Sequence, residues 1–167
     1  AIRRQRQMCI ETGVSGYRVY LYKGKKLAKS VDTTKRTLTF KKLSKGTGYK
    51  IVVKAYKTID GKKSLSLVSK ELLTATKLSA PTSVKVKAGK KRAIISWTKD
   101  KSANSYTVYY STNKNSGFKK LTVIKNSADI KKLTSGKTYY FKVVANKKVG
   151  KAAVASDCSK LVSAKIK

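Results

Sequence analysis

The chain carries the same hydrophobic pattern twice, 90 residues apart. A Leu-x-x-Gly-x-x-Tyr motif is followed by apolar residues at every second position, once over residues 43–55 and again over residues 133–145. A turn followed by strict alternation is typical of a half-buried β-strand. Its repetition at a domain-sized interval predicts two copies of one small all-β domain.

Short alternating segments separated by turn residues predict seven strands in the second repeat. They are expected at 83–87, 93–97, 106–110, 118–124, 126–132, from 139 onward, and at 158–166, with a loop at Asn146–Lys151. Such spacing indicates an antiparallel β-sandwich.

The first repeat follows the same order from Tyr17 onward. Its strands are expected at 17–21, 27–31 and 37–40, from 49 onward, and at 67–76. Asp60-Gly61 is a favoured pair for a tight hairpin turn. The single proline, Pro81, stands just before the second repeat, where a missing N–H does least harm. Residues 76–82 are therefore the predicted linker between domains 1–77 and 78–167.

The second repeat resembles the fibronectin type III family. The resemblance rests on Pro81, Ile95-Ser96-Trp97, Tyr106-x-Val108 and Leu133-x-x-Gly136-x-x-Tyr139. It implies two tandem seven-stranded fibronectin type III-like (Ig-like) β-sandwiches, in which Tyr139 and Tyr49 form the corner that bonds back to the upstream backbone. The lysine- and tyrosine-rich style is similar to repeats of extracellular proteins of Gram-positive bacteria. That likeness implies an extracellular, cell-surface or cell-wall location.

The start of the first repeat departs from the family pattern. Its opening strand is expected before Ala1, and Met8 stands where the second repeat has Trp97. Arg4 and Arg6 occupy positions that should point inward. We expect the chain to be a fragment of a longer protein, or the missing strand to come from another chain, because an uncovered sheet edge invites pairing.

Positive charge is spread over both repeats. The formal net charge is +34, with 20 basic against 4 acidic residues in 1–77 and 21 against 3 in 78–167. This balance favours a polyanionic partner. Only six of the basic residues are arginine. Because arginine dominates base readout and phosphate clamping, the composition argues against sequence-specific nucleic-acid recognition.

The ingredients of an active site are missing. The chain has no histidine, its seven acidic residues are scattered, and its glycines form no phosphate-binding cluster. We therefore expect no enzyme activity, no metal and no cofactor. Cys9 and Cys158 lie at non-equivalent positions and suggest no disulfide within a domain. No apolar run is long enough to span a membrane, and Ala1 opens no secretory signal pattern.

Strand alternation places tyrosines beside basic residues on one outward sheet face of each domain. The candidate ligand-binding residues are Tyr20, Tyr22, Lys54 and Tyr56 in the first domain, and Tyr109, Tyr140 and Lys142 in the second. Tyrosines can stack on sugar rings while lysines meet anionic groups. Ordinary cross-strand pairing of an aromatic ring with a lysine stem explains the pattern equally well.

Two clusters of lysines add further candidates. Phe40 to Lys45 alternates basic pairs with apolar spacers and contributes Lys41, Lys42 and Lys45, while the predicted loop at 146–151 contributes Lys147, Lys148 and Lys151. Lysines on turns also keep a protein soluble and block edge-to-edge aggregation. The total charge exceeds what solubility requires, so an anionic environment is favoured.

The sequence favours a non-catalytic spacer and attachment module that binds an anionic polysaccharide or cell-wall polymer by diffuse electrostatics. Three alternatives stay open. The chain could be a structural subunit of a filament or virion, completed by a neighbouring subunit at the open edge of its first domain. It could bind nucleic acid without sequence preference. It could also be an accessory module of a carbohydrate-active enzyme.

Overall fold

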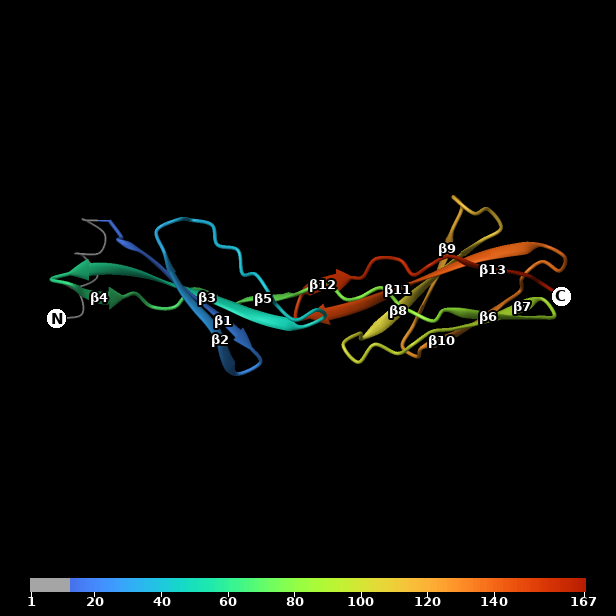
Figure 1. Ribbon diagram of the computed structural model, residues 1–167, viewed down its shortest axis with the longest axis horizontal. Coiled ribbons are helices and arrows are strands. Elements are labelled where there is room, and N and C mark those ends of the chain that lie inside the picture. Colours follow the sequence, from blue (N-terminus) through green and yellow to red (C-terminus); the bar gives the residue numbers. More distant parts are fainter. Residues whose placement is uncertain (1–12) are drawn as a thin grey trace. The chain divides into compact units, whose positions relative to one another are not determined.

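The computed structural model describes residues 13–167, which contain thirteen β-strands and no helix (Figure 1). The predicted all-β class is confirmed. The chain forms two compact units. Unit 1 comprises the residues up to Leu43 together with 48–74, and unit 2 comprises 44–47 together with 75–167. None of the described residues belongs to a helix that could cross a membrane.

The described part of unit 1 contains one antiparallel sheet. Its strands are β1 (Gly16–Lys23), β2 (Lys26–Thr33), β3 (Gly48–Ile59), β4 (Lys62–Leu65) and β5 (Leu72–Ala75). The order is β2-β1-β3-β4, and β5 also pairs with β3. The predicted hairpin is confirmed: Asp60 and Gly61, with φ of 47° and 74°, form the two-residue turn between β3 and β4. Positive φ at both positions is what this turn requires.

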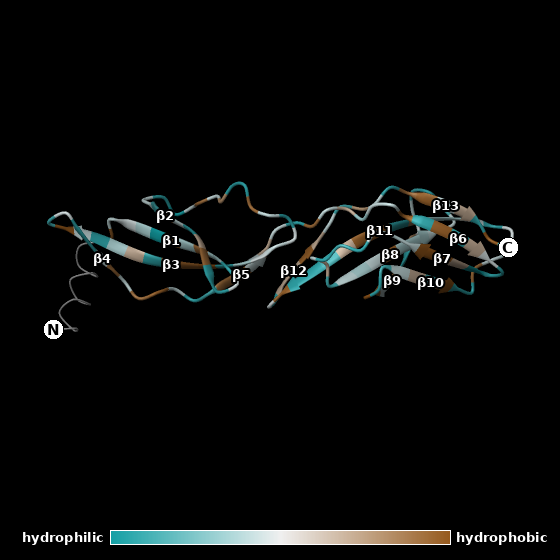
Figure 2. Ribbon diagram, turned by 60° about the horizontal axis from the view of Figure 1, so that its bottom comes forward, coloured by the Kyte–Doolittle hydropathy of each residue, from teal (hydrophilic) through white to brown (hydrophobic). Residues whose placement is uncertain are grey.

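Unit 2 is a sandwich of two sheets. One sheet has the order β10-β7-β6, formed by Ser127–Lys131, Arg92–Ser96 and Lys85–Gly89. The other has the order β12-β11-β8-β9, with β13 also on β11. These strands are β12 (Ala152–Ala155), β11 (Thr138–Val149), β8 (Ser105–Ser111), β9 (Lys119–Val123) and β13 (Val162–Lys165). Hydrophobic and hydrophilic residues both occur along β11 (Figure 2), and Phe141 and Val143 are buried while Lys142 between them stays partly exposed, so one side of this strand faces the core.

The core of unit 2 is fully closed. Ile95 from β7 meets Val108 from β8 and Phe141 and Val143 from β11, and all four side chains have no exposed surface. Trp97 packs edge-on against Tyr106 with ring centroids 5.1 Å apart. At roughly 1.5–3 kcal/mol for each fully buried large side chain, this cluster supplies the main stabilisation of the sandwich.

Two sequence expectations need correction. Asn146, Lys147 and Lys148 lie in strand β11 and not in a loop, because β11 continues to Val149 before it turns into β12. Residues 37–40 are not a strand. Their counterpart in unit 2 is β10, which pairs with β7. The described part of unit 1 contains no counterpart of β7, and no described strand pairs with this segment.

In each unit, the two serines of a Ser-x-x-Ser segment accept hydrogen bonds from backbone N–H groups of the longest strand. In unit 2, N–H groups of β11 donate to Oγ of Ser156 and Ser159 at 2.9 and 3.0 Å. In unit 1, N–H groups of β3 donate to Oγ of Ser66 and Ser69, both at 3.0 Å. The hydroxyls thus satisfy strand donors where the regular ladder is interrupted. Sequence reasoning missed these serines, although their shared spacing in the two repeats was a usable signal.

Candidate anion-binding surfaces

The outward face of unit 1 places aromatic rings among charged groups, as the alternation predicted. Tyr20 and Tyr22 stack with ring centroids 6.5 Å apart, and the Lys50 ammonium lies 5.2 Å from the Tyr22 ring centroid. Lys50 also pairs with Glu71 at 2.6 Å. The aromatic pair is therefore partly engaged by a cation of the same sheet, which is the cross-strand pairing that the sequence left as an alternative.

Tyr56 lies on the same face but is buried, with 8% of its surface exposed. Its hydroxyl packs over Gly16: a Cβ added there would stand 2.6 Å from the Tyr56 oxygen. The Lys63 ammonium lies 4.6 Å from the ring centroid. Tyr56 thus behaves as a packing residue of the sheet. Lys54 stands opposite Arg18 across β1 and β3 and is half-buried.

An ion cluster crosses this face of unit 1. The Arg18 guanidinium donates to both carboxylate oxygens of Asp32 at 2.6 and 2.8 Å, and Lys63 donates to one of them at 2.5 Å. These hydrogen bonds, first from Arg18 and then from Lys63, hold the pKa of Asp32 well below its usual range. The same carboxylate raises the pKa of Arg18. With two cations on one carboxylate, the cluster keeps a net positive charge.

The corresponding face of unit 2 centres on Lys142. Its ammonium lies 5.9 Å from the Tyr109 ring centroid and 4.2 Å from that of Phe118. Tyr140 stands opposite Ser111 and is half-buried. The predicted neighbours Tyr109 and Lys142 are thus brought together. Phe118 was not predicted as part of the face, although the expected strand 118–124 begins with it; it lies immediately before β9.

The two lysine clusters differ in whether their side chains bond to other groups of the protein. The Lys147 ammonium donates to the Ser102 carbonyl at 2.8 Å, which fixes this side chain against the edge of unit 2. Lys148 and Lys151 are exposed. The other cluster, Lys41, Lys42 and Lys45, is exposed as well.

Most acids in the described chain already have cationic partners. Besides Asp32 and Glu71, Asp129 pairs with Arg92 at 2.9 Å and Asp157 with Lys77 at 2.6 Å. No cluster of three His, Cys, Asp or Glu side chains suited to a metal ion occurs within residues 13–167. Cys158 is a free, exposed thiol, and Cys9 lies outside the described residues. Most of the positive charge is left without an internal counter-charge.

The corner tyrosine of unit 2 is confirmed. The backbone N–H of Thr134 donates to the Tyr139 hydroxyl at 3.2 Å, five residues upstream. Hydrogen bonding with the side chain and the backbone of Thr134 lowers the pKa of Tyr139. This contact fixes the turn that precedes β11. The equivalent residue of unit 1, Tyr49, is buried.

Comparisons with known proteins agree with this geometry. Residues 79–157 match the family model of the fibronectin type III domain. Unit 2 is a fibronectin type III domain. No curated protein sequence matches the chain.

Solved structures extend the likeness beyond residues 79–157 to most of the chain. A two-domain fibronectin type III segment of chicken tenascin is 21% identical, with a TM-score of 0.55, covering 93% of this chain and 86% of that one. The FN1–FN3 domains of chicken CNTN1 are 20% identical, with a TM-score of 0.50. The match covers 91% of this chain but 56% of the CNTN1 chain. At these identities the likeness is one of fold.

Proposed function

We propose that the chain is a non-catalytic spacer and attachment module that binds anionic wall polymers or glycans through its lysines. The observation that carries the proposal is the charge balance: the acids at 32, 71, 129 and 157 are paired within the protein, while the net charge is +34. A surface of this kind attracts polyanions and concentrates them near the protein.

The mechanism follows from the kind of cation and its surroundings. Lysine is a hydrated point charge on a flexible stem, which suits many weak contacts better than one rigid clamp. At physiological salt the screening length is about 8 Å, so only lysines close to the polymer contribute. The stacked Tyr20–Tyr22 pair and the Lys142 cluster offer places where a sugar ring could rest beside a cation.

The setting of the module is part of the proposal. Fibronectin type III domains are typical of extracellular proteins, and the lysine- and tyrosine-rich composition resembles repeats of Gram-positive bacteria. Teichoic acids and acidic glycans supply negative charge in that environment. Nucleic acid would be bound only without sequence preference.

Binding to a panel of polymers tests the proposal. Wall teichoic acid, a sulfated glycan, a neutral glycan and DNA are titrated with the full chain at salt concentrations from about 50 to 500 mM. We expect binding to the anionic polymers, weakening steadily with salt, and none to the neutral glycan. Failure to bind any anionic polymer at the lowest salt would contradict it.

Variants separate diffuse charge from a defined site. Replacement of Lys148 and Lys151 by Gln removes two exposed charges, whereas Tyr109→Ala removes a ring and leaves the charge unchanged. Diffuse attraction predicts a smaller salt dependence for the lysine variant and little effect of the tyrosine variant. A large loss with Tyr109→Ala alone would instead assign a specific site to that face.

A second candidate is a structural subunit of a filament or virion whose first domain is completed by a neighbouring chain. The observation that favours it is that no strand among residues 13–167 pairs with residues 37–40 of unit 1. A defined assembly with slow amide exchange in this segment would support it.

A further inference from the structure

Aromatic rings hold the Lys142 ammonium in place on the outward face of unit 2. The ammonium lies 4.2 Å from the ring centroid of Phe118 and 5.9 Å from that of Tyr109. Tyr109 stands directly opposite Lys142 across β8 and β11, and the lysine is half-buried. Two rings that attract one cation restrict a side chain that is otherwise flexible. The charge of Lys142 therefore has a defined position on this face.

No carboxylate shares this cation. None of the ion pairs among residues 13–167 involves Lys142. Lys50 also lies over a tyrosine ring, but it pairs with Glu71. Lys63 likewise lies over a ring and pairs with Asp32. An ammonium carries three N–H donors, so Lys142 can donate to an anionic group of a ligand while the rings hold it.

A row of uncharged polar side chains crosses the same face beside Lys142. Asn146 Nδ2 donates to Thr107 Oγ1 at 2.9 Å, and the Thr107 hydroxyl lies 3.5 Å from that of Thr122. Thr107 and Tyr109 are two residues apart on β8, which corresponds to about 7 Å. Thr122 is exposed, so its hydroxyl can bond to a ligand as well. A ring-sized ligand in contact with Lys142 therefore reaches this row.

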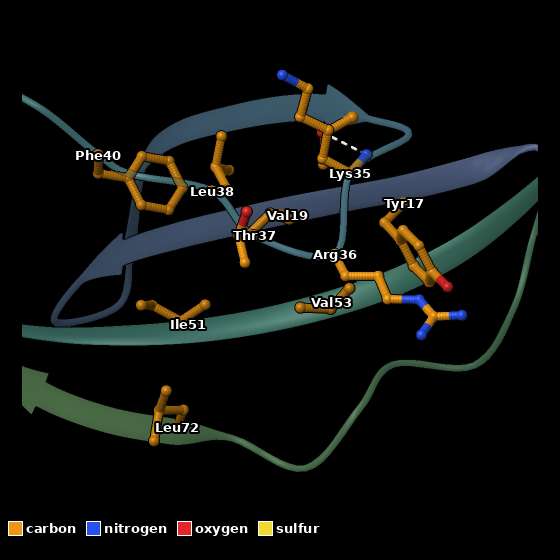
Figure 3. A pocket seen from close by; sticks show the side chains of 11 residues that line it. Tyr17, Val19, Lys35, Arg36, Thr37, Leu38, Phe40, Ile51, Val53 and Leu72 are labelled. Carbon is orange, nitrogen blue, oxygen red and sulfur yellow. Dashed lines mark hydrogen bonds between the residues drawn. The ribbon is translucent and has the colours of Figure 1, made fainter.

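The first unit has a different set of residues on its outward face. Val52, Tyr56 and Arg18 stand there at the repeat positions of Lys142, Asn146 and Thr107. The inner sides of the two units agree, because Val19, Ile51 and Val53 of unit 1 are apolar like their counterparts in unit 2 (Figure 3). The strand pattern of the repeat therefore does not itself require a cation, an amide and a hydroxyl at these outward positions.

A positioned cation beside hydroxyl and amide groups suits a sugar that carries an acidic substituent. A carboxylate or sulfate oxygen accepts a charge-assisted hydrogen bond from Lys142. Sugar hydroxyls both donate and accept, as do the groups of Thr122 and Asn146. A simple anion would use only the cation, and a neutral sugar would use only the polar row. An acidic sugar residue uses both.

We propose that the outward face of unit 2 is a binding site for an acidic sugar residue of a glycan chain. The inference rests on the proposed function, because it assigns one defined contact to a polyanion that the module binds. Lys142 donates to the acidic substituent, while Phe118 and Tyr109 hold its ammonium. Thr122 and Asn146 bond to the sugar hydroxyls. The rings position the cation and do not themselves stack on the sugar.

Short oligomers test the proposal on the full chain, because a long polymer also meets the other lysines. Tetragalacturonate and sulfated maltotetraose present a carboxylate or a sulfate on sugar rings. Capped tetraglutamate presents carboxylates without a sugar, and maltotetraose is an uncharged sugar. In NMR titrations at constant ionic strength, at least one acidic sugar should bind about tenfold tighter than both controls. It should shift the amide resonances of residues 107, 122 and 142.

Matched substitutions locate the site. Lys142→Gln removes the positioned cation, and Lys148→Gln removes one exposed charge from the same strand. Lys142→Gln should weaken binding of the acidic sugar about tenfold, and Lys148→Gln less than about twofold. Thr122→Val removes an exposed hydroxyl at unchanged charge and should weaken binding about threefold. Phe118→Leu keeps charge and apolar character and should cost about threefold as well, because the ammonium loses its support.

Three results would overturn the proposal. Equal binding of tetraglutamate and the acidic sugars would show that charge alone attracts them. Equal losses with Lys142→Gln and Lys148→Gln would show that no single lysine marks a site. Absence of binding by either acidic sugar, while wall teichoic acid still binds with its salt dependence, would remove the site and leave the proposed diffuse attachment standing. Loss of polymer binding as well would refute both.

Discussion

The hydroxyl of Ser159 offers a sharp test of how the second unit is held together. It accepts a hydrogen bond from the Val143 N–H at 3.0 Å and donates to the Lys160 carbonyl at 2.9 Å. Val143 is fully buried and Ser159 is 8% exposed. Ser159→Ala would leave the Val143 N–H buried without its acceptor, which costs about 1–3 kcal/mol.

The first unit supplies the matched control. Ser69 accepts from the Val53 N–H at the same distance, 3.0 Å, but its side chain is exposed. Water can replace the hydroxyl of Ser69, so we expect Ser69→Ala to cost no more than about 1 kcal/mol. The comparison isolates the effect of burial, because the two serines make the same bonds at equivalent repeat positions.

Tryptophan fluorescence reports the outcome for unit 2 alone. Trp97 is the only tryptophan of the chain, and it is 4% exposed within the core of that unit. With a urea dependence of about 1–3 kcal/mol per molar, a loss of about 2 kcal/mol lowers the midpoint by about 1 M. The reasoning is refuted if Ser159→Ala leaves the midpoint unchanged, or if amide exchange shows that Ser69→Ala destabilises β3 of unit 1 by as much as Ser159→Ala destabilises unit 2.

Three further outcomes follow from single contacts. Tyr139→Phe removes the corner hydrogen bond and should lower the stability of unit 2 by about 0.5–1.5 kcal/mol, measured by the same fluorescence transition; an unchanged midpoint would contradict the role of the corner. The lowered pKa of Asp32 means that its contribution to the stability of unit 1 is complete above about pH 4 and is lost as the pH falls through the lowered value. The protection of amides in β1 and β2, relative to the intrinsic exchange rate at each pH, should therefore fall at low pH in the unaltered chain, and Asp32→Asn should remove that fall; an equal fall in both would contradict it. Gly16→Ala should displace the Tyr56 ring, since the added Cβ would meet its hydroxyl at 2.6 Å. Tyrosine ring shifts in the NMR spectrum would record the change, and an unmoved Tyr56 resonance would count against this packing.

The sequence predicted the second unit well because its signals are local. Alternation at 106–110 and from 139 onward set the buried face of β8 and β11, and the Leu-x-x-Gly-x-x-Tyr motif located the corner. Residues 146–148 were misplaced in a loop because charged and polar side chains on an exposed strand extension look like loop residues. Pairing with β12, a long-range property, makes them a strand.

The first unit shows where local pattern stops being sufficient. Thr37 to Phe40 alternates as β10 does, yet a strand requires a hydrogen-bonded neighbour, and no described residue of unit 1 provides one. The candidate face shows the same limit. Alternation placed Tyr56 correctly on the outward side, but only the approach of Gly16 shows that its ring is buried.

The salt dependence of binding to wall teichoic acid tests the central claim most directly. For the full chain, the account predicts that the logarithm of the binding constant falls linearly with the logarithm of salt concentration. Replacement of Lys148 and Lys151 by Gln should make the slope of this line shallower. A binding constant that does not change between about 50 and 500 mM salt, or binding of a neutral glycan with equal strength, would contradict attachment by diffuse lysine charge.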